Sequence, residues 1–487
     1  MTEARKEATA TAGRNRQLFG TDGVRGIANI EPMTSETVLR LGRAVAYVFR
    51  GAQRRHKIVI GKDTRISGYM LETAMASGIC SMGVDVMLVG PLPTPGIAFL
   101  TRSLRADAGA VISASHNQFH DNGIKFFSSQ GFKLPDELEL EIERLVLDTE
   151  IDHLRPTAQE IGKAFRIDDA LGRYNVFVKN TFPRELTLDG LRVVVDCANG
   201  AAYRVAPEVL AELGASVAAI GTDPDGENIN RDCGATTPAA LQAAVIEHRA
   251  NVGIAFDGDG DRCVLVDECG TLIDGDAVMA IAAREMASAG RLAGRTLVAT
   301  HMSNFGLDLA MRELGINVAR TEVGDRYVLE EMLRGGYNLG GEQSGHVLFL
   351  DHTTTGDGLI TALAILGIMQ ARATPLSALG HIVQKFPQVL VNVPVRQKRD
   401  LAEVPAVRAA VDSVEKALSG RGRVYIRYSG TEALARVMVE GEDLTRVEAY
   451  AADIADAVRA ALGSGRDGVQ QTAPTRPGEE AVRPKGA

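Results

Sequence analysis

The sequence is poor in cysteine and has no long apolar run. Its 487 residues contain 5 scattered cysteines, and no two of them have the C-x-x-C spacing of a zinc site. An odd, scattered set also argues against a disulfide framework, so we expect a reducing, cytoplasmic environment. No apolar stretch is long enough to cross a bilayer, and residues 1–16 lack the apolar core of a signal peptide. We therefore expect neither membrane attachment nor secretion.

An excess of basic residues is absent as well. The formal net charge is −9, which disfavours a nucleic acid as partner. The pattern G-x-x-x-x-G-K-[ST] does not occur, which argues against ATP binding through a P-loop. The glycine-rich stretch 19–26 does not have the G-x-G-x-x-G spacing of a dinucleotide site. What remains is the composition of an ordinary globular protein, with 45% hydrophobic and 24% charged residues.

The chain length predicts about three or four domains, and three of them are visible as an internal repeat. Strand-like and helix-like segments alternate, which is typical of an α/β fold with crossover connections. The order strand, helix, strand, helix, strand occurs three times, beginning with the runs 57–61, 191–196 and 296–300. In each copy a glycine follows the first helix, as helix C-termini favour: Gly83, Gly214 and Gly315.

A polar loop follows the third strand of every copy. The three loops read Ser-His-Asn at 115–117, Asp-Gly-Asp-Gly-Asp-Arg at 257–262 and Glu-Gln-Ser-Gly-His at 342–346. Ligands of open α/β sheets bind at the carboxyl ends of the strands, so copies packed side by side would bring these loops to one cleft. Polar loops also occur at such positions without a shared role. The complementary chemistry of the three loops favours a common cleft.

Ser115 is the candidate nucleophile. It follows the apolar run 110–112, where rigid backbone would hold a hydroxyl open to a ligand, and this arrangement suits a nucleophile or a phosphate carrier. Lys125, at the foot of the same loop, could reach a phosphate. His116 and His346 are candidates for proton transfer, although a single histidine is often structural.

Three aspartates within five residues indicate a cation site. Asp257, Asp259 and Asp261 would repel one another unless a cation neutralises them, and oxygen ligands favour Mg²⁺, Mn²⁺ or Ca²⁺. An EF-hand is excluded, because Arg262 stands where glycine is required and the flanking segments look like strands. A glycine-rich turn with few carboxylates favours Mg²⁺ that keeps positions open for phosphate oxygens. A solvated acidic turn is the alternative.

Two further glycine-rich segments predict phosphate contacts. Arg25 lies between glycines in the stretch 19–26, and its guanidinium could bind a phosphate. The second segment follows the strand-like run 424–426 and combines a glycine turn with two hydroxyls and two arginines: Arg427, Ser429, Gly430, Thr431 and Arg436. Because this segment lies outside the three repeats, it predicts a fourth domain.

Together, these motifs resemble those of the α-D-phosphohexomutase superfamily. Five stretches carry the resemblance, in the family's order and over about residues 17–465: 19–26, 112–117, 257–262, 341–346 and 427–432. The resemblance implies three repeated α/β domains and a smaller C-terminal α+β domain that binds phosphate. We expect these domains at 17–172, 173–273, 274–388 and 389–465, between an unstructured head, 1–16, and an unstructured tail, 466–487.

The resemblance also implies a catalytic cycle. Ser115 would be carried as phosphoserine, and one Mg²⁺ per active site would be held by that phosphate and by Asp257, Asp259 and Asp261. Phosphoserine would give its phosphoryl group to one sugar hydroxyl, and the other phosphate of the resulting bisphosphate would return to the serine.

The remaining candidate residues take their roles from the same resemblance. Four would complete the catalytic group: Arg25, His116, Lys125 and Arg262. Three would bind the sugar: Glu342, Ser344 and His346. The segment from Arg427 to Arg436 would hold the phosphate that does not react. The expected partner is a small sugar phosphate, without nucleic acid or membrane, and the expected assembly is a homodimer.

Within the superfamily, three features point to the branch that converts glucosamine 6-phosphate to glucosamine 1-phosphate for UDP-N-acetylglucosamine synthesis. They are Gln343 and the stretches 233–238 and 350–357. Two residues depart from the family pattern, since Gln118 and Ala433 stand where many relatives have proline. These departures bear on the rigidity of the loops more than on their chemistry.

Other functions stay open at the level of the sequence. A phosphoglucomutase or phosphomannomutase of the same superfamily would share the chemistry and differ in the sugar loop. A metal-dependent phosphatase with a serine nucleophile would release phosphate, which a mutase does not. A non-catalytic sensor of sugar phosphate or Ca²⁺ is disfavoured, because nucleophile, metal and phosphate loops are grouped together.

Overall fold

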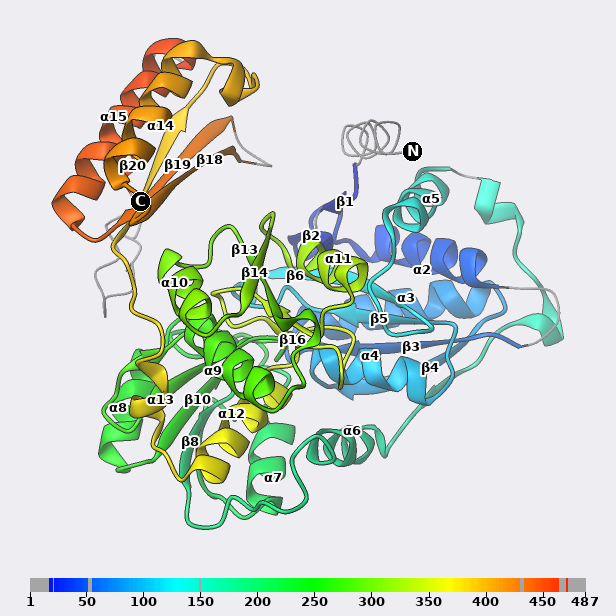
Figure 1. Ribbon diagram of the computed structural model, residues 1–487. Coiled ribbons are helices and arrows are strands. Elements are labelled where there is room, and N and C mark those ends of the chain that lie inside the picture. The colour runs from blue at the N-terminus through cyan, green and yellow to red at the C-terminus, as the bar shows by residue number, and fades with distance from the viewer. Residues whose placement is uncertain are drawn as a thin grey trace.

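Four β-sheets follow one another along the chain, and helices cover them (Figure 1). The computed structural model describes residues 17–20, 22–50, 55–148, 150–429, 433–463 and 470–471. The first three domains lie together, and the C-terminal domain, orange and red in Figure 1, follows a linker and contacts the third domain. No helix within these ranges is long and apolar enough to cross a membrane. The predicted four-domain α/β architecture is confirmed.

The first domain contains a mixed sheet of seven strands. Its strands are β1 (Phe19–Gly20), β2 (Gly23–Ile27), β3 (Lys57–Lys62), β4 (Asp85–Pro91), β5 (Ala108–Ile112), β6 (Asp121–Ser128) and β7 (Ala164–Arg166). Its helices are α2 (Ser35–Phe49), α3 (Ser67–Ser81), α4 (Thr94–Ser103), α5 (Asp136–Leu147), η1 (Glu150–His153) and η2 (Ala158–Glu160). The strand order is β1-β2-β6-β5-β3-β4-β7, with β3 parallel to both β4 and β5.

The second and third domains contain smaller sheets of five and four strands. The second holds α6 (Ala170–Lys179), β8 (Arg192–Asp196), α7 (Val205–Glu212), β9 (Ser216–Ile220), α8 (Ala239–Glu247), β10 (Val252–Phe256), β11 (Cys263–Asp267) and β12 (Leu272–Ile273). The third holds α9 (Gly275–Ser288), η3 (Ala293–Arg295), β13 (Thr296–Thr300), α10 (Phe305–Glu313), β14 (Asn317–Thr321), α11 (Asp325–Gly335), β15 (Leu339–Gly341), β16 (Val347–Phe349), α12 (Gly358–Arg372) and α13 (Leu376–Gly380).

The three sheets repeat one arrangement, as the sequence predicts. The first strand of each copy lies between the second and third, parallel to both: β3, β8 and β13. The glycine after the first helix has a positive φ in every copy, +84° at Gly83, +105° at Gly214 and +63° at Gly315. A residue with a Cβ would be strained there, which explains the shared residue type. An antiparallel strand follows the third strand of each copy: β6, β11 and β16.

The C-terminal domain packs two helices on a four-stranded antiparallel sheet. Its elements are β17 (Gln388–Pro394), η4 (Leu401–Glu403), α14 (Pro405–Leu418), β18 (Gly422–Tyr428), β19 (Leu434–Gly441), α15 (Leu444–Leu462) and β20 (Gln470–Gln471). Buried and half-buried residues alternate along β17, and its buried valines belong to the core that α14 and α15 cover. Such alternation is typical of a sheet with one covered face.

The short strand β20 lies in the segment that the sequence predicts to be an unstructured tail. At these two residues the structure differs from the prediction, because Gln470 and Gln471 pair with Asn392 and Val391. β17 offers unpaired N–H and C=O groups at the sheet edge, and backbone pairing of this kind needs no apolar side chain. The rest of the predicted tail and the predicted head, 1–16, lie outside the described residues.

One hydrophobic core joins the first three domains, whereas the C-terminal domain has its own. The shared core runs from Val59 of β3 through Tyr174 of α6 to Leu366 of α12. Polar groups link the C-terminal domain to the third domain. Arg423 donates to the carbonyls of His301 (2.9 Å) and Ser303 (2.6 Å). The C-terminal domain can therefore shift with less loss of buried apolar area than the other three.

A buried carboxylate ties α6 to the first turn of α12. Asp357 accepts hydrogen bonds from the hydroxyl of Tyr174 (2.8 Å) and from the N–H groups of Leu359 and Ile360 (3.0 Å each). Burial raises the pKa of Asp357 from 3.8 to about 6. The folded protein therefore takes up a proton that the unfolded chain does not hold between about pH 4 and pH 6.

We expect the Asp357→Asn variant to gain stability relative to the parent protein as the pH rises. The stability that the protonated carboxyl contributes is complete below pH 3.8 and is lost as the pH passes the folded-state pKa of about 6. The shift corresponds to roughly 3 kcal/mol. About 2 kcal/mol of this falls between pH 4.5 and pH 8, so the difference in Tm between variant and parent should grow by roughly 2–3 °C over that range. Thermal unfolding followed by circular dichroism measures it, and a difference independent of pH would contradict the assignment.

Candidate active site

The polar loops that follow β5, β10 and β15 meet at one place. The hydroxyl of Ser115 donates to Asp257 Oδ2 (2.6 Å), which joins the first loop to the second. Nδ1 of His346 lies 3.4 Å from Asp261 Oδ1, and the N–H of Cys263 donates to the carbonyl of Gly345 (3.0 Å). These contacts join the second loop to the third. The carboxyl ends of the three central sheets therefore converge, as the sequence predicts.

Ser115 is held in an unusual backbone conformation. Its φ is +52°, in the left-handed region that few residues other than glycine adopt. Its N–H donates to Ser113 Oγ (2.9 Å), and its side chain is buried between the first and second domains. Strained residues of this kind persist only where the surroundings fix them, and they concentrate at functional sites.

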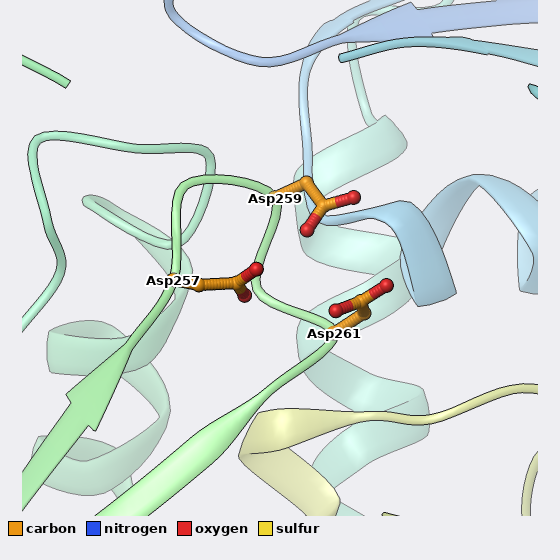
Figure 2. Close-up of side chains that lie close together, drawn as sticks. All are labelled: Asp257, Asp259 and Asp261. Carbon is orange, nitrogen blue, oxygen red and sulfur yellow. The ribbon is translucent and has the colours of Figure 1, made fainter. Parts of the chain in front are cut away.

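The three aspartates point toward one another in the turn between β10 and β11 (Figure 2). One carboxylate oxygen from each lies within 4.8 Å of the others, and all three residues are buried. Burial raises the pKa of Asp257 well above its usual range, and Asp259 and Asp261 raise it further. Oδ1 of Asp259 is buried without a hydrogen-bond partner among the described residues. Clustered carboxylates with an unpaired buried oxygen fit the ligand set of a hard divalent cation.

The EF-hand alternative is excluded by the structure as well. Glu268, which would stand at the last position of such a loop, accepts a hydrogen bond from the N–H of Ser377 (3.3 Å). Its carboxylate is thus engaged on α13. The segments on either side of the aspartates are the strands β10 and β11, which pair with each other.

Lys125 is the cation nearest to the aspartates. Its Nζ lies 3.1 Å from Asp22 Oδ2, 3.3 Å from Asp259 Oδ2 and 3.8 Å from Asp261 Oδ2. Burial disfavours the charged ammonium, but the carboxylates outweigh burial and raise the pKa of Lys125. The side chain therefore carries a permanent positive charge beside the three aspartates.

A chain of ion pairs links the first domain to the third. Asp22 contacts Arg25, Lys125 and Lys133, and these cations outweigh its burial and hold its pKa well below the usual range. Lys133 also pairs with Asp325 Oδ2 (2.5 Å), and that oxygen lies 3.5 Å from His346 Nε2. The predicted residues Arg25, Lys125 and His346 thus belong to one charged network.

Asp22, Lys133 and Asp325 are parts of this network that reasoning from the sequence missed. Asp22 stands inside the stretch 19–26, in which the glycines and Arg25 carry the signal for a phosphate contact. Asp325 is the first residue of α11, where an acidic side chain is common for reasons of helix stability alone. Lys133 follows the β6 hairpin and carries no local signal.

His116 lies beside Ser115, and Arg262 lies beside the aspartates. Nδ1 of His116 lies 3.4 Å from Ser115 Oγ. Burial, together with Arg262 and Arg25, lowers the pKa of His116 from 6.5 to about 4, so the ring is neutral near pH 7. The N–H of Arg262 donates to Asp257 Oδ1 (3.2 Å), and its Nε lies 3.9 Å from Asp261 Oδ1.

The third loop presents its polar groups to the cleft. Ser344 is exposed and Glu342 half-buried, and the hydroxyl of Ser344 lies 3.4 Å from Glu342 Oε2. The N–H of Gly324 donates to Glu342 Oε1 (3.1 Å). Gln343 points the other way, and its amide donates to Asp276 Oδ2 (3.0 Å). Two side chains of the loop are therefore open to a ligand, and the third anchors the loop.

The predicted phosphate-binding residues of the C-terminal domain lie on a separate sheet (Figure 1). Arg427 of β18 and Arg436 of β19 are directly opposite in the register of the two strands. Like charges at such positions destabilise a sheet, and an anion bound between them would remove the cost. Ser429 is buried, and its carbonyl accepts from Lys398 Nζ (2.6 Å). Gly430 and Thr431 lie outside the described residues.

Models of known protein families match most of the chain. Four family models match in order: phosphoglucomutase/phosphomannomutase alpha/beta/alpha domain I over residues 16–152, domain II over 173–270, domain III over 274–386 and the C-terminal domain over 390–457. These ranges place the serine loop in domain I, the aspartates in domain II, the third loop in domain III and the arginine pair in the C-terminal domain.

Curated relatives are similar over nearly their whole length. A phosphoglucosamine mutase from Citrifermentans bemidjiense is 60% identical over 448 residues, which cover 92% of this chain and 99% of the relative. One from Anaeromyxobacter dehalogenans is 61% identical over 456 residues, which cover 92% and 100%. Solved structures are similar in fold. A phosphoglucomutase/phosphomannomutase family protein from Burkholderia thailandensis superimposes with a TM-score of 0.77 at 24% identity, over 93% of this chain and 98% of that protein.

Proposed function

Because the chain belongs to the phosphoglucomutase/phosphomannomutase family, we propose that Ser115 carries the phosphoryl group that the enzyme transfers. The activity is that of a phosphoglucosamine mutase, an isomerase that interconverts glucosamine 6-phosphate and glucosamine 1-phosphate. The observation that carries the proposal is the hydrogen bond from Ser115 Oγ to Asp257 (2.6 Å) within the cluster of three buried carboxylates.

The aspartates would hold Mg²⁺, with phosphorylated Ser115 as a further ligand. Bound there, Mg²⁺ would supply positive charge to the oxygens of the transferring phosphoryl group. Lys125, Arg25 and Arg262 add three fixed positive charges around the same place. Together they offset the repulsion between a phosphorylated serine and an incoming sugar phosphate, and they stabilise the charge of the transition state.

The reaction moves a phosphate without consuming one. The P–O bond at Ser115 breaks as a bond forms to the free 1-hydroxyl of glucosamine 6-phosphate, which gives the 1,6-bisphosphate. The bisphosphate then turns in the cleft, and its 6-phosphate returns to Ser115. The proton that the 1-hydroxyl gives up is restored at the 6-oxygen in this second half. Because Ser115 is buried, water has little access to its phosphate between turnovers.

The remaining candidate residues serve binding of the sugar and of its other phosphate. Glu342 and Ser344 would hydrogen-bond sugar hydroxyls, and His346 would stand beside them, held between Asp261 and Asp325. Arg427 and Arg436, with Ser429, Gly430 and Thr431, would grip whichever phosphate is not reacting. A site that accepts either phosphate lets the sugar present either end to Ser115.

We expect the Arg427→Gln variant to bind its substrate more weakly without losing stability. Removal of one charge-assisted hydrogen bond to phosphate should raise KM by roughly 10- to 100-fold, with a smaller change in kcat. The opposed residue, Arg436, is relieved of like-charge repulsion, so Tm should not fall. Steady-state kinetics and thermal unfolding test both parts. An unchanged KM would place the distal phosphate elsewhere.

Parallel assays with three substrates test the proposed function. Purified protein with Mg²⁺ is given glucosamine 6-phosphate, glucose 1-phosphate or mannose 1-phosphate, and isomerised product and free phosphate are both measured. The proposal predicts the highest kcat/KM with glucosamine 6-phosphate and almost no free phosphate. Preference for the other two sugars would indicate a different specificity within the family, and stoichiometric phosphate release would indicate a phosphatase. Peptide mapping by mass spectrometry should find phosphate on Ser115.

The cellular setting and the assembly stay predictions. The substrate and product are phosphorylated sugars of intermediary metabolism, which supports the cytoplasmic location expected from the cysteines. The predicted homodimer is testable by light scattering of the full chain.

A further inference from the structure

A buried arginine lies directly behind the serine loop. Arg65 follows β3 and has no exposed surface. Its Nε donates to Asp63 Oδ2 (2.8 Å), and one terminal nitrogen donates to the carbonyls of Ser115 (2.9 Å) and Asn117 (2.8 Å). The other donates to the carbonyls of Gln118 and Asp121 (3.2 Å for the latter). All five N–H groups of the guanidinium are therefore used, four of them on the backbone of one loop.

The carboxylate partner of this arginine reaches the other side of Ser115. Asp63 Oδ2 accepts from the hydroxyl of Ser113 (2.6 Å), and Ser113 Oγ accepts from the N–H of Ser115 (2.9 Å). The Asp63–Arg65 pair thus fixes both the N–H and the C=O of Ser115. These bonds account for how a serine is kept at a φ of +52°.

The residues on either side of Arg65 form hydrogen bonds to the second domain. Thr64 donates through its hydroxyl to the carbonyl of Asn199 (2.5 Å), and the N–H of Ile66 donates to the carbonyl of Gly226 (2.9 Å). From the opposite side, the amide of Asn230 donates to the carbonyls of Ser115 and Asn117 (2.9 Å each). The serine loop is therefore clamped between Arg65 of the first domain and Asn230 of the second.

The loop that carries the three aspartates packs directly against this clamp. A Cβ added at Gly258 would lie 2.6 Å from the carbonyl oxygen of Ser115 and 2.7 Å from the amide nitrogen of Asn230. The backbone between Asp257 and Asp259 is thus in close contact with the group that Arg65 and Asn230 hold. A displacement of the serine carbonyl would change the distance from Ser115 Oγ to Asp257.

We propose that Arg65 is a positioning residue for phosphoryl transfer, which holds Ser115 against the aspartates so that its phosphate stays aligned with metal and substrate. The proposal rests on the proposed role of Ser115 as phosphate carrier. Arg65 does not touch the substrate and acts through the backbone of the loop. Lysine cannot replace it, because three donors on one nitrogen cannot reach four carbonyls and a carboxylate.

The test compares Arg65→Lys with a matched variant of a half-buried arginine, Arg320. Arg320 binds the carbonyls of Thr300, Ser303 and Asn304 and the carboxylate of Asp308, in the third domain. Both variants keep the positive charge and lose the guanidinium fork. We measure kcat, KM, Tm and the rate at which phosphate on Ser115 is lost to water in the absence of sugar.

For Arg65→Lys we expect kcat to fall by about 100-fold with KM changed by less than about threefold, because a misplaced reacting group costs rate rather than binding. The phosphate on Ser115 should be lost at least about tenfold faster. Arg320→Lys should lower Tm while the phosphate on Ser115 stays as long-lived as in the parent. The inference is overturned if both variants lose Tm and kcat in the same proportion and retain the same phosphate lifetime.

A second variant covers the case in which Arg65→Lys does not fold. Asn230→Ala removes the clamp from the second domain without leaving a buried charge, and we expect kcat to fall by about tenfold with faster phosphate loss. Unchanged kcat and phosphate lifetime in Asn230→Ala would also overturn the inference. Failure of the proposed function is distinct, since the parent protein would then carry no phosphate on Ser115.

Discussion

Replacement of Ser115 by alanine is expected to lower kcat for the interconversion of glucosamine 6-phosphate and glucosamine 1-phosphate by at least about 10,000-fold. In the proposed mechanism, the variant lacks the oxygen that accepts and returns the phosphoryl group in every turnover. Binding should persist, because the aspartates, Lys125 and the arginines of the C-terminal domain are unchanged. Titration calorimetry should find the affinity for glucosamine 1,6-bisphosphate within about threefold of the dephosphorylated parent.

The structure offers a matched control for the loss of a hydroxyl. Ser288 ends α9 on the surface, and its hydroxyl donates to the carbonyl of Glu285 (2.9 Å). Ser288→Ala should keep full activity and one phosphate per chain, whereas Ser115→Ala should carry none. If Ser115→Ala isomerised its substrate and held a stoichiometric phosphate on another residue, the phosphate carrier would have been misassigned.

The sequence alone located the three loops because two physical signals coincide there. β5 and β10 are buried along their whole length, so their apolar runs stand out from the chain. Chemically reactive residues follow immediately, at the edge of a parallel sheet where ligands bind. Because the pattern occurs three times, a polar loop in one copy supports the prediction of equivalent loops in the other two. Residues such as Asp257 and Ser115, whose neighbours in the sequence indicate their role, can be predicted in this way.

Residues that act through partners distant in the sequence could not be predicted from it. Arg65 lies 50 positions before Ser115, and in the sequence it is an ordinary arginine after a strand. Lys133 and Asp325 pair across 192 positions and between two domains. Such contacts depend on how the domains pack, which periodicity and loop motifs do not determine. The sequence thus predicts the groups that perform the chemistry better than the groups that hold them in place.

The difference in predictability between reactive groups and supporting groups comes from the cost of burying a charge. A nucleophile or metal ligand needs a particular residue type at a particular end of a strand. A supporting group needs only the right donors in the right volume, and several positions of the chain could supply them. Arg65 is confined to its position by five simultaneous hydrogen bonds, a condition that exists only in the folded protein.

Replacement of Asp257 by asparagine is expected to change activity and stability in opposite directions. In the absence of metal, three buried carboxylates repel, and burial with Asp259 and Asp261 raises the pKa of Asp257. A raised pKa means that stability is lost as the pH rises through it. Asparagine removes that loss, so in EDTA the variant should melt roughly 2–5 °C above the parent at pH 8, with a smaller difference at pH 5.

With Mg²⁺ present the order should reverse. The parent gains stability in proportion to its metal affinity, whereas the variant lacks one ligand and should gain much less. Its kcat should fall by at least about 100-fold, because the charge that stabilises the transferring phosphoryl group is weakened. Tm as a function of Mg²⁺ concentration and steady-state kinetics give both results from the same preparations.

Asp196 provides the control that separates the metal from buried charge in general. It ends β8 in the same sheet, is fully buried, and accepts hydrogen bonds from the N–H groups of Ala198 (2.9 Å) and Gly234 (2.7 Å). Burial raises its pKa too, but it is not one of the three clustered carboxylates. Asp196→Asn should therefore keep the full stabilisation by Mg²⁺ that Asp257→Asn loses. If Asp257→Asn responded to Mg²⁺ as Asp196→Asn does, the cation would have to bind elsewhere, and the repulsion among the three aspartates would need another counter-charge, for which Lys125 is the nearest source.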